Sequence, residues 1–253
     1  MPRRFLSHWR GILLSLIGIV AILWLGLTDQ LGLYIHPRYF VFTIAMSVAA
    51  TVFVLLAFAF LPNTASEVVR PEPSSKSPRG VGAWTSANIL LLAVTAAALL
   101  VLPPVTLTNA TVAQRDINGS ASSPADNESV ILVGADDSAL SVKDWAGILR
   151  QGADEVSLAG KTPTLIGFVT PDPDDPTNVF YVARFVITCC AVDAQPIGVP
   201  VYLPGWQDQY DVDEWVSVTG GFVSNPSTES FQAIVLSPSD ISVTDQPARP
   251  YVY

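Results

Sequence analysis

The sequence has very few residues of the types that carry redox, metal and nucleophilic chemistry. Its 253 residues include two cysteines, which are adjacent at Cys189 and Cys190, and two histidines, His8 and His36. A Cys-x-x-Cys redox motif and a glycine-rich phosphate-binding loop are both absent. Because no histidine follows residue 36, the C-terminal half also lacks the base of a Ser/His/Asp catalytic set. We therefore expect a protein that is not an enzyme.

Charged residues are also scarce, at 14% of the chain, and they are unevenly distributed. Residues 1–107 carry seven basic and three acidic side chains, a net charge of +4, whereas residues 108–253 carry six basic and 19 acidic side chains, a net charge of −13. A basic, apolar half joined to an acidic, polar half predicts a membrane anchor that bears a soluble domain. The negative charge of that domain argues against nucleic-acid binding, because phosphates would be repelled.

Three apolar stretches predict transmembrane helices at about residues 11–31, 40–61 and 87–107. A cleaved signal peptide is the alternative for the first stretch, but no small-residue cleavage site follows it. Lys and Arg are concentrated before the first stretch and between the second and third. The positive-inside rule then predicts a multi-pass protein of the cell membrane, with a cytoplasmic N-terminus and an extracytoplasmic C-terminal domain.

The C-terminal half begins with a small, polar segment, residues 108–128, which is typical of a linker. Residues 129–253 predict the soluble domain. It opens with an apolar run at 129–137 and a helix that Ser141 and Asp144 can cap and Gly152 can end.

Five β segments follow, at residues 162–170, 179–192, 197–205, 213–224 and 230–245. Five strands with a longer connector between the third and fourth indicate an OB-fold-like barrel, with a β-sandwich as the alternative. Gly167, Gly220 and Gly221 lie where a small barrel needs strong coiling. The predicted fold class is therefore a membrane-anchored α+β protein, with three N-terminal transmembrane helices and a mainly β, five-stranded OB-like domain.

Three segments carry a resemblance to a known family: "GFVTPD", "FYVARFVITCCAVDAQPIGVPV" and "DEWVSVTGGF". They resemble the YcgQ-like bacterial membrane proteins. The resemblance implies N-terminal membrane spans, a C-terminal OB-like barrel and an association with a multi-span permease encoded nearby. It suggests a non-enzymatic, membrane-anchored accessory subunit of a permease, whose outer domain binds a partner or ligand.

The adjacent cysteines lie at the end of the second β segment. Successive side chains of a strand point to opposite faces. The wholly apolar face is expected to line the barrel and consists of Tyr181, Ala183, Phe185, Ile187 and Cys189. Cys190 shares the other face with Arg184 and Thr188, so it is expected to be the accessible, functional thiol.

Three interpretations of the cysteine pair stay open. A disulfide between them would require a distorted peptide, because the side chains of adjacent strand residues diverge. A metal site would use Cys190 and Asp193, with Cys189 as an optional further ligand and zinc as the cation. The C-terminal half offers no histidine to complete it, so a partner protein would have to supply the missing ligand. The third interpretation is packing alone. The alternative function is therefore a thiol-based metal-binding or redox-sensing module.

Arg184 is expected to form an ion pair with Asp193, because a charged residue inside an apolar strand normally has a partner. Recognition of a carboxylate ligand is the alternative role for Arg184. The candidate residues for ligand or partner binding are therefore Arg184, Thr188, Cys189, Cys190 and Asp193.

Overall fold

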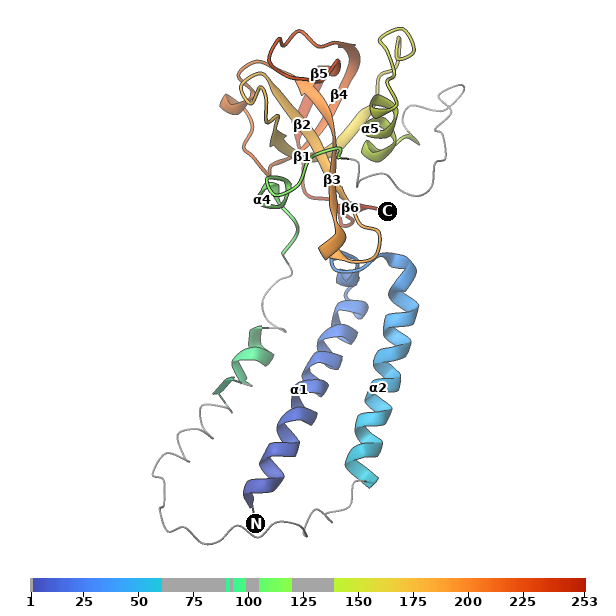
Figure 1. The fold of residues 1–253 in the computed structure, drawn as a ribbon, viewed down its shortest axis with the longest axis vertical. Coiled ribbons are helices and arrows are strands. Elements are labelled where there is room, and N and C mark those ends of the chain that lie inside the picture. Colours follow the sequence, from blue (N-terminus) through green and yellow to red (C-terminus); the bar gives the residue numbers. More distant parts are fainter. Residues whose placement is uncertain (1, 61–89, 92, 99–104, 120–138) are drawn as a thin grey trace. The chain divides into compact units, whose positions relative to one another are not determined.

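The computed structural model describes residues 2–60, 90–91, 93–98, 105–119 and 139–253 (Figure 1). The chain divides into two compact units. The first contains residues 1–32 and 37–104. The second contains residues 105–253 and also four residues from the N-terminal half, Leu33–His36. Each unit is described by itself.

The first unit is helical. Its two long helices are α1 (Pro2–Leu27) and α2 (Phe40–Phe60). The loop between them contains two short 3-10 helices, η1 (Gln30–Leu33) and η2 (Pro37–Tyr39). Helix α1 ends where the Thr28 hydroxyl donates to the carbonyl oxygen of Trp24 at 2.9 Å and Asp29 takes a positive φ of 56°. The left-handed backbone at Asp29 cannot continue an α-helix.

Helix α2 is apolar except for a stripe of hydroxyl side chains, Thr43, Ser47 and Thr51, along one face. Val41, Phe42 and Phe53 are 80%, 64% and 71% exposed. Among the described residues, one stretch, Pro37–Leu56, is long and apolar enough to cross a bilayer, and Leu14–Leu27 in α1 is a shorter apolar segment. The third expected span, residues 87–107, lies mostly outside the described residues.

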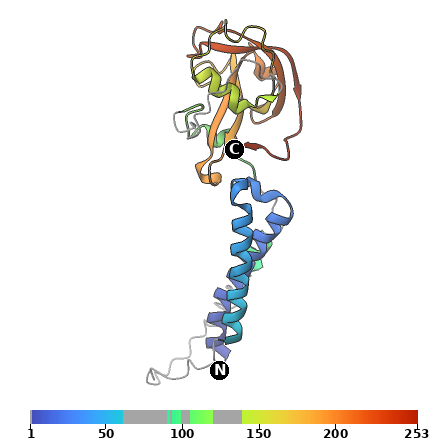
Figure 2. The ribbon, with the colours of Figure 1, turned by 90° about the vertical axis from the view of Figure 1, so that its right-hand side faces the viewer.

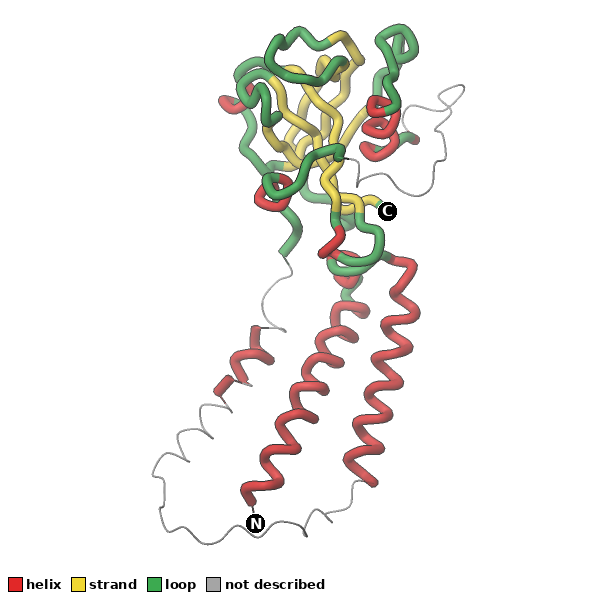
Figure 3. Tube along the Cα trace, in the orientation of Figure 1, coloured by secondary structure: helices red, strands yellow, loops and turns green. Residues whose placement is uncertain are grey.

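The second unit contains a closed barrel of five strands (Figures 1 and 3). The strands are β1 (Thr164–Pro171), β2 (Val179–Val186), β3 (Gln195–Tyr202), β4 (Trp215–Ser224) and β5 (Ile234–Val243). Their order is β1-β4-β5-β3-β2, and pairing of β1 with β2 closes the ring. β3 and β5 are parallel and the other pairs of the ring are antiparallel. This arrangement confirms the OB-like barrel, and closure makes the β-sandwich alternative wrong.

Two glycines permit the close strand approach that closure needs. A side chain at Gly167 would collide with the backbone of Ala183 in β2, and one at Gly220 would collide with Ser237 in β5. A bulge separates Thr219 from Gly220. This bulge lies beside Gly220 and Gly221, where the sequence predicts strong coiling. An added Cβ at Gly221 would be 3.9 Å from its nearest neighbour, so Gly221 is not a point of close approach.

The barrel interior is filled by buried side chains from all five strands. They include Val169, Phe180, Val199, Val218 and Leu236. Helix α5 (Val142–Arg150) packs against this core, and Figure 2 shows it in front of the barrel strands.

Helix α5 forms as its sequence predicts. Ser141 and Asp144 make a reciprocal capping box at its start, and Gly152 follows its end with a φ of 82°. Trp145 is fully buried, and its ring centroid lies 5.1 Å from that of Phe222. The strand expected at 129–137 lies outside the described residues.

The inner face of β2 is the opposite of the one predicted. Phe180 and Val182 point into the barrel, whereas Tyr181, Ala183 and Phe185 form a second cluster on its outer side. That outer face is buried too, because it is covered by the short helix α4 (Asn109–Val112), its flanking residues and the C-terminal strand β6 (Tyr251–Val252).

Part of the segment that the sequence assigns to a linker therefore packs on the barrel. Asn118 donates through its side-chain amide to the carbonyl oxygen of Gly198 at 2.8 Å, and it accepts from the Gly198 N–H at 2.9 Å. Residues 105–119 thus belong to the folded C-terminal unit.

Candidate metal centre

The cysteine pair lies on a tight turn, not in a strand. β2 ends at Val186, and residues Ala191–Asp193 form the 3-10 helix η5. The Asp193 carboxylate accepts N–H groups from Thr188 at 3.1 Å, Cys189 at 2.7 Å and Cys190 at 3.3 Å. These bonds bend the chain away from β2, so the prediction of one strand through residue 192 is wrong.

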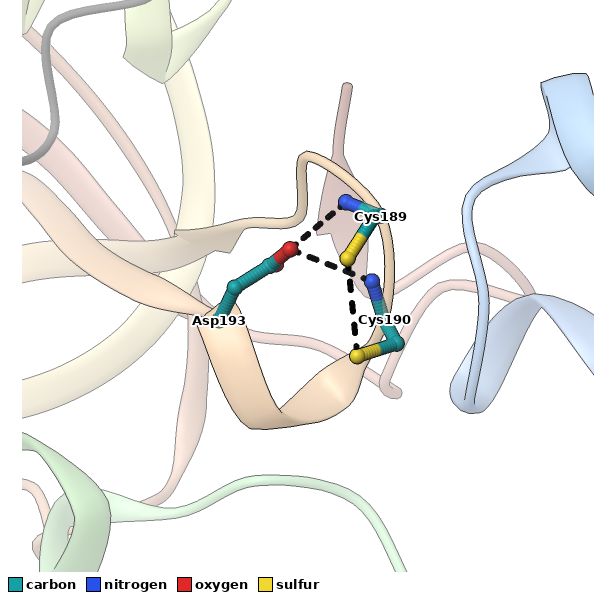
Figure 4. A group of neighbouring side chains, drawn as sticks. All are labelled: Cys189, Cys190 and Asp193. Atoms are coloured by element: carbon teal, nitrogen blue, oxygen red, sulfur yellow. Dashed lines mark hydrogen bonds between the residues drawn. The ribbon is translucent and has the colours of Figure 1, made fainter.

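The turn brings both sulfur atoms together (Figure 4). The Sγ atoms of Cys189 and Cys190 are 3.6 Å apart. These two atoms and a carboxylate oxygen of Asp193 all lie within 4.8 Å of one another. Cys189 is exposed and Cys190 is partly buried. The prediction that Cys189 is the core residue of the pair is therefore wrong, because strand alternation stops before the cysteines.

The separation of the sulfur atoms suits chelation. Two thiolates bound to one tetrahedral zinc, each at about 2.3 Å, would lie about 3.8 Å apart. A linear complex with the same bond length would separate them by about 4.6 Å. A disulfide would bring them to about 2.05 Å. The observed 3.6 Å is closest to the tetrahedral value.

The protonation equilibria of the turn are coupled. The hydrogen bond to Asp193, followed by that to Cys190, raises the pKa of the Cys189 thiol to about 12. Burial acts to raise the pKa of Asp193, but hydrogen bonds from the Cys189 thiol and from the turn N–H groups outweigh it and lower that pKa. Without a cation, Cys189 therefore holds its proton and Asp193 is ionised at neutral pH.

A segment from the N-terminal half borders the same turn, within the second unit. Ile35 forms an antiparallel bridge with Cys190. The N–H of His36 donates to the carbonyl oxygen of Cys189 at 3.0 Å, and the N–H of Ala191 donates to that of Tyr34 at 2.8 Å. No pattern in the C-terminal half could reveal this neighbour. The available signal was the predicted topology, which puts residues 28–39 and the domain on one side of the membrane.

Arg184 is not part of the cysteine group. Its Nε donates to the carbonyl oxygen of Ile166 at 2.8 Å, its Nη1 donates to that of Arg249 at 3.3 Å, and its guanidinium lies 5.3 Å from the ring centroid of Trp215. The predicted ion pair with Asp193 is wrong, because the backbone of the cysteine turn occupies that carboxylate. Thr188 does join the group, through its N–H.

This barrel and its turn fall within a recognised domain. Residues 143–253 match the family model of the DUF1980 C-terminal domain. No curated protein and no solved structure matches the chain. The region that matches the DUF1980 C-terminal domain includes α5 from its second residue, all five barrel strands and the cysteine turn, whereas Tyr34–His36 lies outside it.

Proposed function

We propose that this protein is a non-enzymatic, membrane-anchored module whose C-terminal barrel binds a thiophilic cation through Cys189 and Cys190. The observation that carries the proposal is the 3.6 Å separation of the two Sγ atoms on an accessible turn. Thiolates are soft ligands that suit zinc, and the sulfur spacing is compatible with a tetrahedral ion.

Asp193 has a positioning role in this proposal. Its carboxylate holds three successive N–H groups and so fixes the backbone that carries both thiols. It also accepts a hydrogen bond from the Cys189 thiol. A cation held by both thiolates would take the place of that thiol proton. The affinity should therefore fall as the pH falls, because cation and proton compete for the same sulfur.

Titration of the full-length protein in detergent micelles with Co²⁺ and then Zn²⁺ tests this proposal. Thiolate ligation should give sulfur-to-cobalt charge-transfer absorption that zinc abolishes. Cys189→Ser and Cys190→Ser should each weaken it, and the double variant should lose it. A wild-type spectrum that matches the double variant would refute cation binding.

A second candidate function is the one suggested by the resemblance to YcgQ-like proteins, an accessory subunit of a multi-span permease. The apolar surface of α2 supports it, because side chains such as Val41 and Phe53 need a lipid or protein neighbour. This role predicts that a multi-span permease is encoded beside this protein, and co-expression with it, followed by purification through a tag on either one, tests the pairing. Recovery of each protein alone would reject the pairing.

The proposed topology has three spans, a cytoplasmic N-terminus and an extracytoplasmic barrel. The hydrogen bonds between Tyr34–His36 and the cysteine turn support it, because they require the loop before α2 and the barrel to share one side of the membrane. Reporter fusions after Asp126 and after Tyr253 should both be active outside the cytoplasm. Activity only in the cytoplasm would reject this orientation.

A further inference from the structure

The proposed cation site is short of protein ligands. Two thiolates leave two of four tetrahedral positions open, and the Asp193 carboxylate is engaged by the backbone of the turn. Zinc sites are usually completed by cysteine or histidine, but residues 108–253 contain no histidine and no further cysteine. A histidine ligand from this chain would therefore have to come from residues 1–107.

The fold brings one histidine to the turn. Leu33–His36 belongs to the same compact unit as the barrel. The bridge between Ile35 and Cys190 is flanked by the bonds His36 N–H to Cys189 and Ala191 N–H to Tyr34. In antiparallel register, these contacts set His36 opposite Cys189.

The hydrogen bond from the His36 N–H to the carbonyl oxygen of Cys189, at 3.0 Å, places the backbones of these two residues next to each other. The nitrogen atoms of an imidazole ring lie several bonds beyond Cβ, so a ring anchored here is long enough to turn toward the thiols. The His36 ring makes an edge contact with Tyr253, with centroids 4.9 Å apart and planes at 69°. This contact holds the ring beside the turn but not on the sulfur atoms, so ligation requires a rotation about its side-chain torsions.

We propose that His36 supplies the third protein ligand to the cation held by Cys189 and Cys190. This inference rests on the proposed function. A neutral imidazole nitrogen completes a Cys₂His set of three protein ligands. The fourth position stays open to water or to an exchanging ligand, unlike that of a closed structural zinc site. The ion would also link the loop that joins α1 and α2 to the barrel turn, two segments more than 150 residues apart in sequence.

X-ray absorption at the zinc edge tests the ligand set directly, with full-length protein in micelles loaded with one equivalent of Zn²⁺. The wild type should show two sulfur neighbours and one imidazole. His36→Gln should lose the imidazole signal and weaken zinc binding by at least the roughly 10–100-fold that loss of an outer-shell partner costs. His8→Gln, which removes the only other histidine, is the matched control and should behave as the wild type does.

A rescue variant separates ligation from folding. His36→Cys should restore tight binding and raise the sulfur count to three, whereas a merely structural role for His36 would not be rescued in this way. Two sulfur atoms without an imidazole in the wild type, or unchanged affinity in His36→Gln, would overturn the role of His36 while leaving the thiolate site in place. A wild type that binds no zinc would overturn both proposals.

Discussion

The buried carboxylate of Asp172 accepts a hydrogen bond from the Ser230 hydroxyl at 3.0 Å, across two loops that are 58 residues apart in sequence. A second bond, from the Ser227 hydroxyl to Asp175 at 2.6 Å, joins the same loops. Both carboxylates are almost fully buried, at 0% and 2% exposure. The loops connect β1 to β2 and β4 to β5, the loops that many OB barrels use to bind oligonucleotides. In this protein, these two hydrogen bonds connect the β1–β2 loop to the β4–β5 loop.

Ser227→Ala should destabilise the barrel by about 1–3 kcal/mol, because it leaves a buried carboxylate with one hydrogen bond fewer. Chemical unfolding of the full-length protein, followed by near-ultraviolet circular dichroism, measures the change. The matched control is Ser239→Ala, which removes an exposed hydroxyl bonded to the carbonyl oxygen of Thr219. Equal midpoints for the two variants would show that the loop connection contributes no stability.

The same bond predicts a dependence on pH. The hydrogen bond from Ser227 lowers the pKa of Asp175, burial opposes it, and Asn178 lowers the pKa further. The stabilisation is complete above the unfolded value near 3.8 and is lost as the pH falls through the lower folded value. Unfolding midpoints at about pH 6 and about pH 3 should therefore differ more in the wild type than in Ser227→Ala. An equal acid effect in both proteins would contradict this assignment.

The barrel should not bind nucleic acid, despite its OB-like topology. Residues 108–253 carry a net charge of −13, and the loops at the usual binding face are joined through Asp172 and Asp175. Fluorescence anisotropy with labelled single-stranded oligonucleotides should show no saturation at micromolar protein and physiological salt. Saturable binding that weakens as salt increases would contradict the electrostatic argument.

Local signals explain what the sequence predicted well. The capping box of Ser141 and Asp144 lies within one helical turn, and turn-rich segments separate the five strands, so α5 and the number of strands follow from neighbouring residues. The described part of the chain adds β6, which escaped prediction because it has only two residues, Tyr251 and Val252.

Non-local contacts explain the errors. One face of β2 is wholly apolar and the other carries Arg184, so alternation favoured the wrong face: Phe180 points inward and Tyr181 outward. That choice depends on residues 105–119, which cover the outer face. β2 ends because the Asp193 carboxylate accepts the N–H groups of Thr188 and Cys189 and turns the chain. The apolar pattern of the sequence continues past this point, so it predicted a longer strand. The proximity of His36 to the cysteine turn could not be predicted for the same reason, because its hydrogen-bond partner Cys189 is 153 residues away in sequence.

Cys189 should be accessible yet slow to react in the metal-free protein. It is exposed, but its hydrogen bonds to Asp193 and Cys190 raise its pKa to about 12, so little of it is the reactive thiolate at neutral pH. In a Cys190→Ser background, Asp193→Asn should speed alkylation by iodoacetamide, by roughly tenfold for each unit by which the pKa falls. Mass spectrometry of the labelled protein over time gives the rate.

Asp211→Asn is the matched control for this measurement, because it removes an exposed acidic charge elsewhere in the domain. It should leave the alkylation rate unchanged if the effect is specific to Asp193. Cys189→Ala should shift the free energy of unfolding by no more than about 0.5 kcal/mol, as is usual for an exposed side chain. Rapid alkylation of Cys189 with Asp193 intact would mean that the carboxylate does not hold the thiol proton. Asp193 would then serve only to shape the turn.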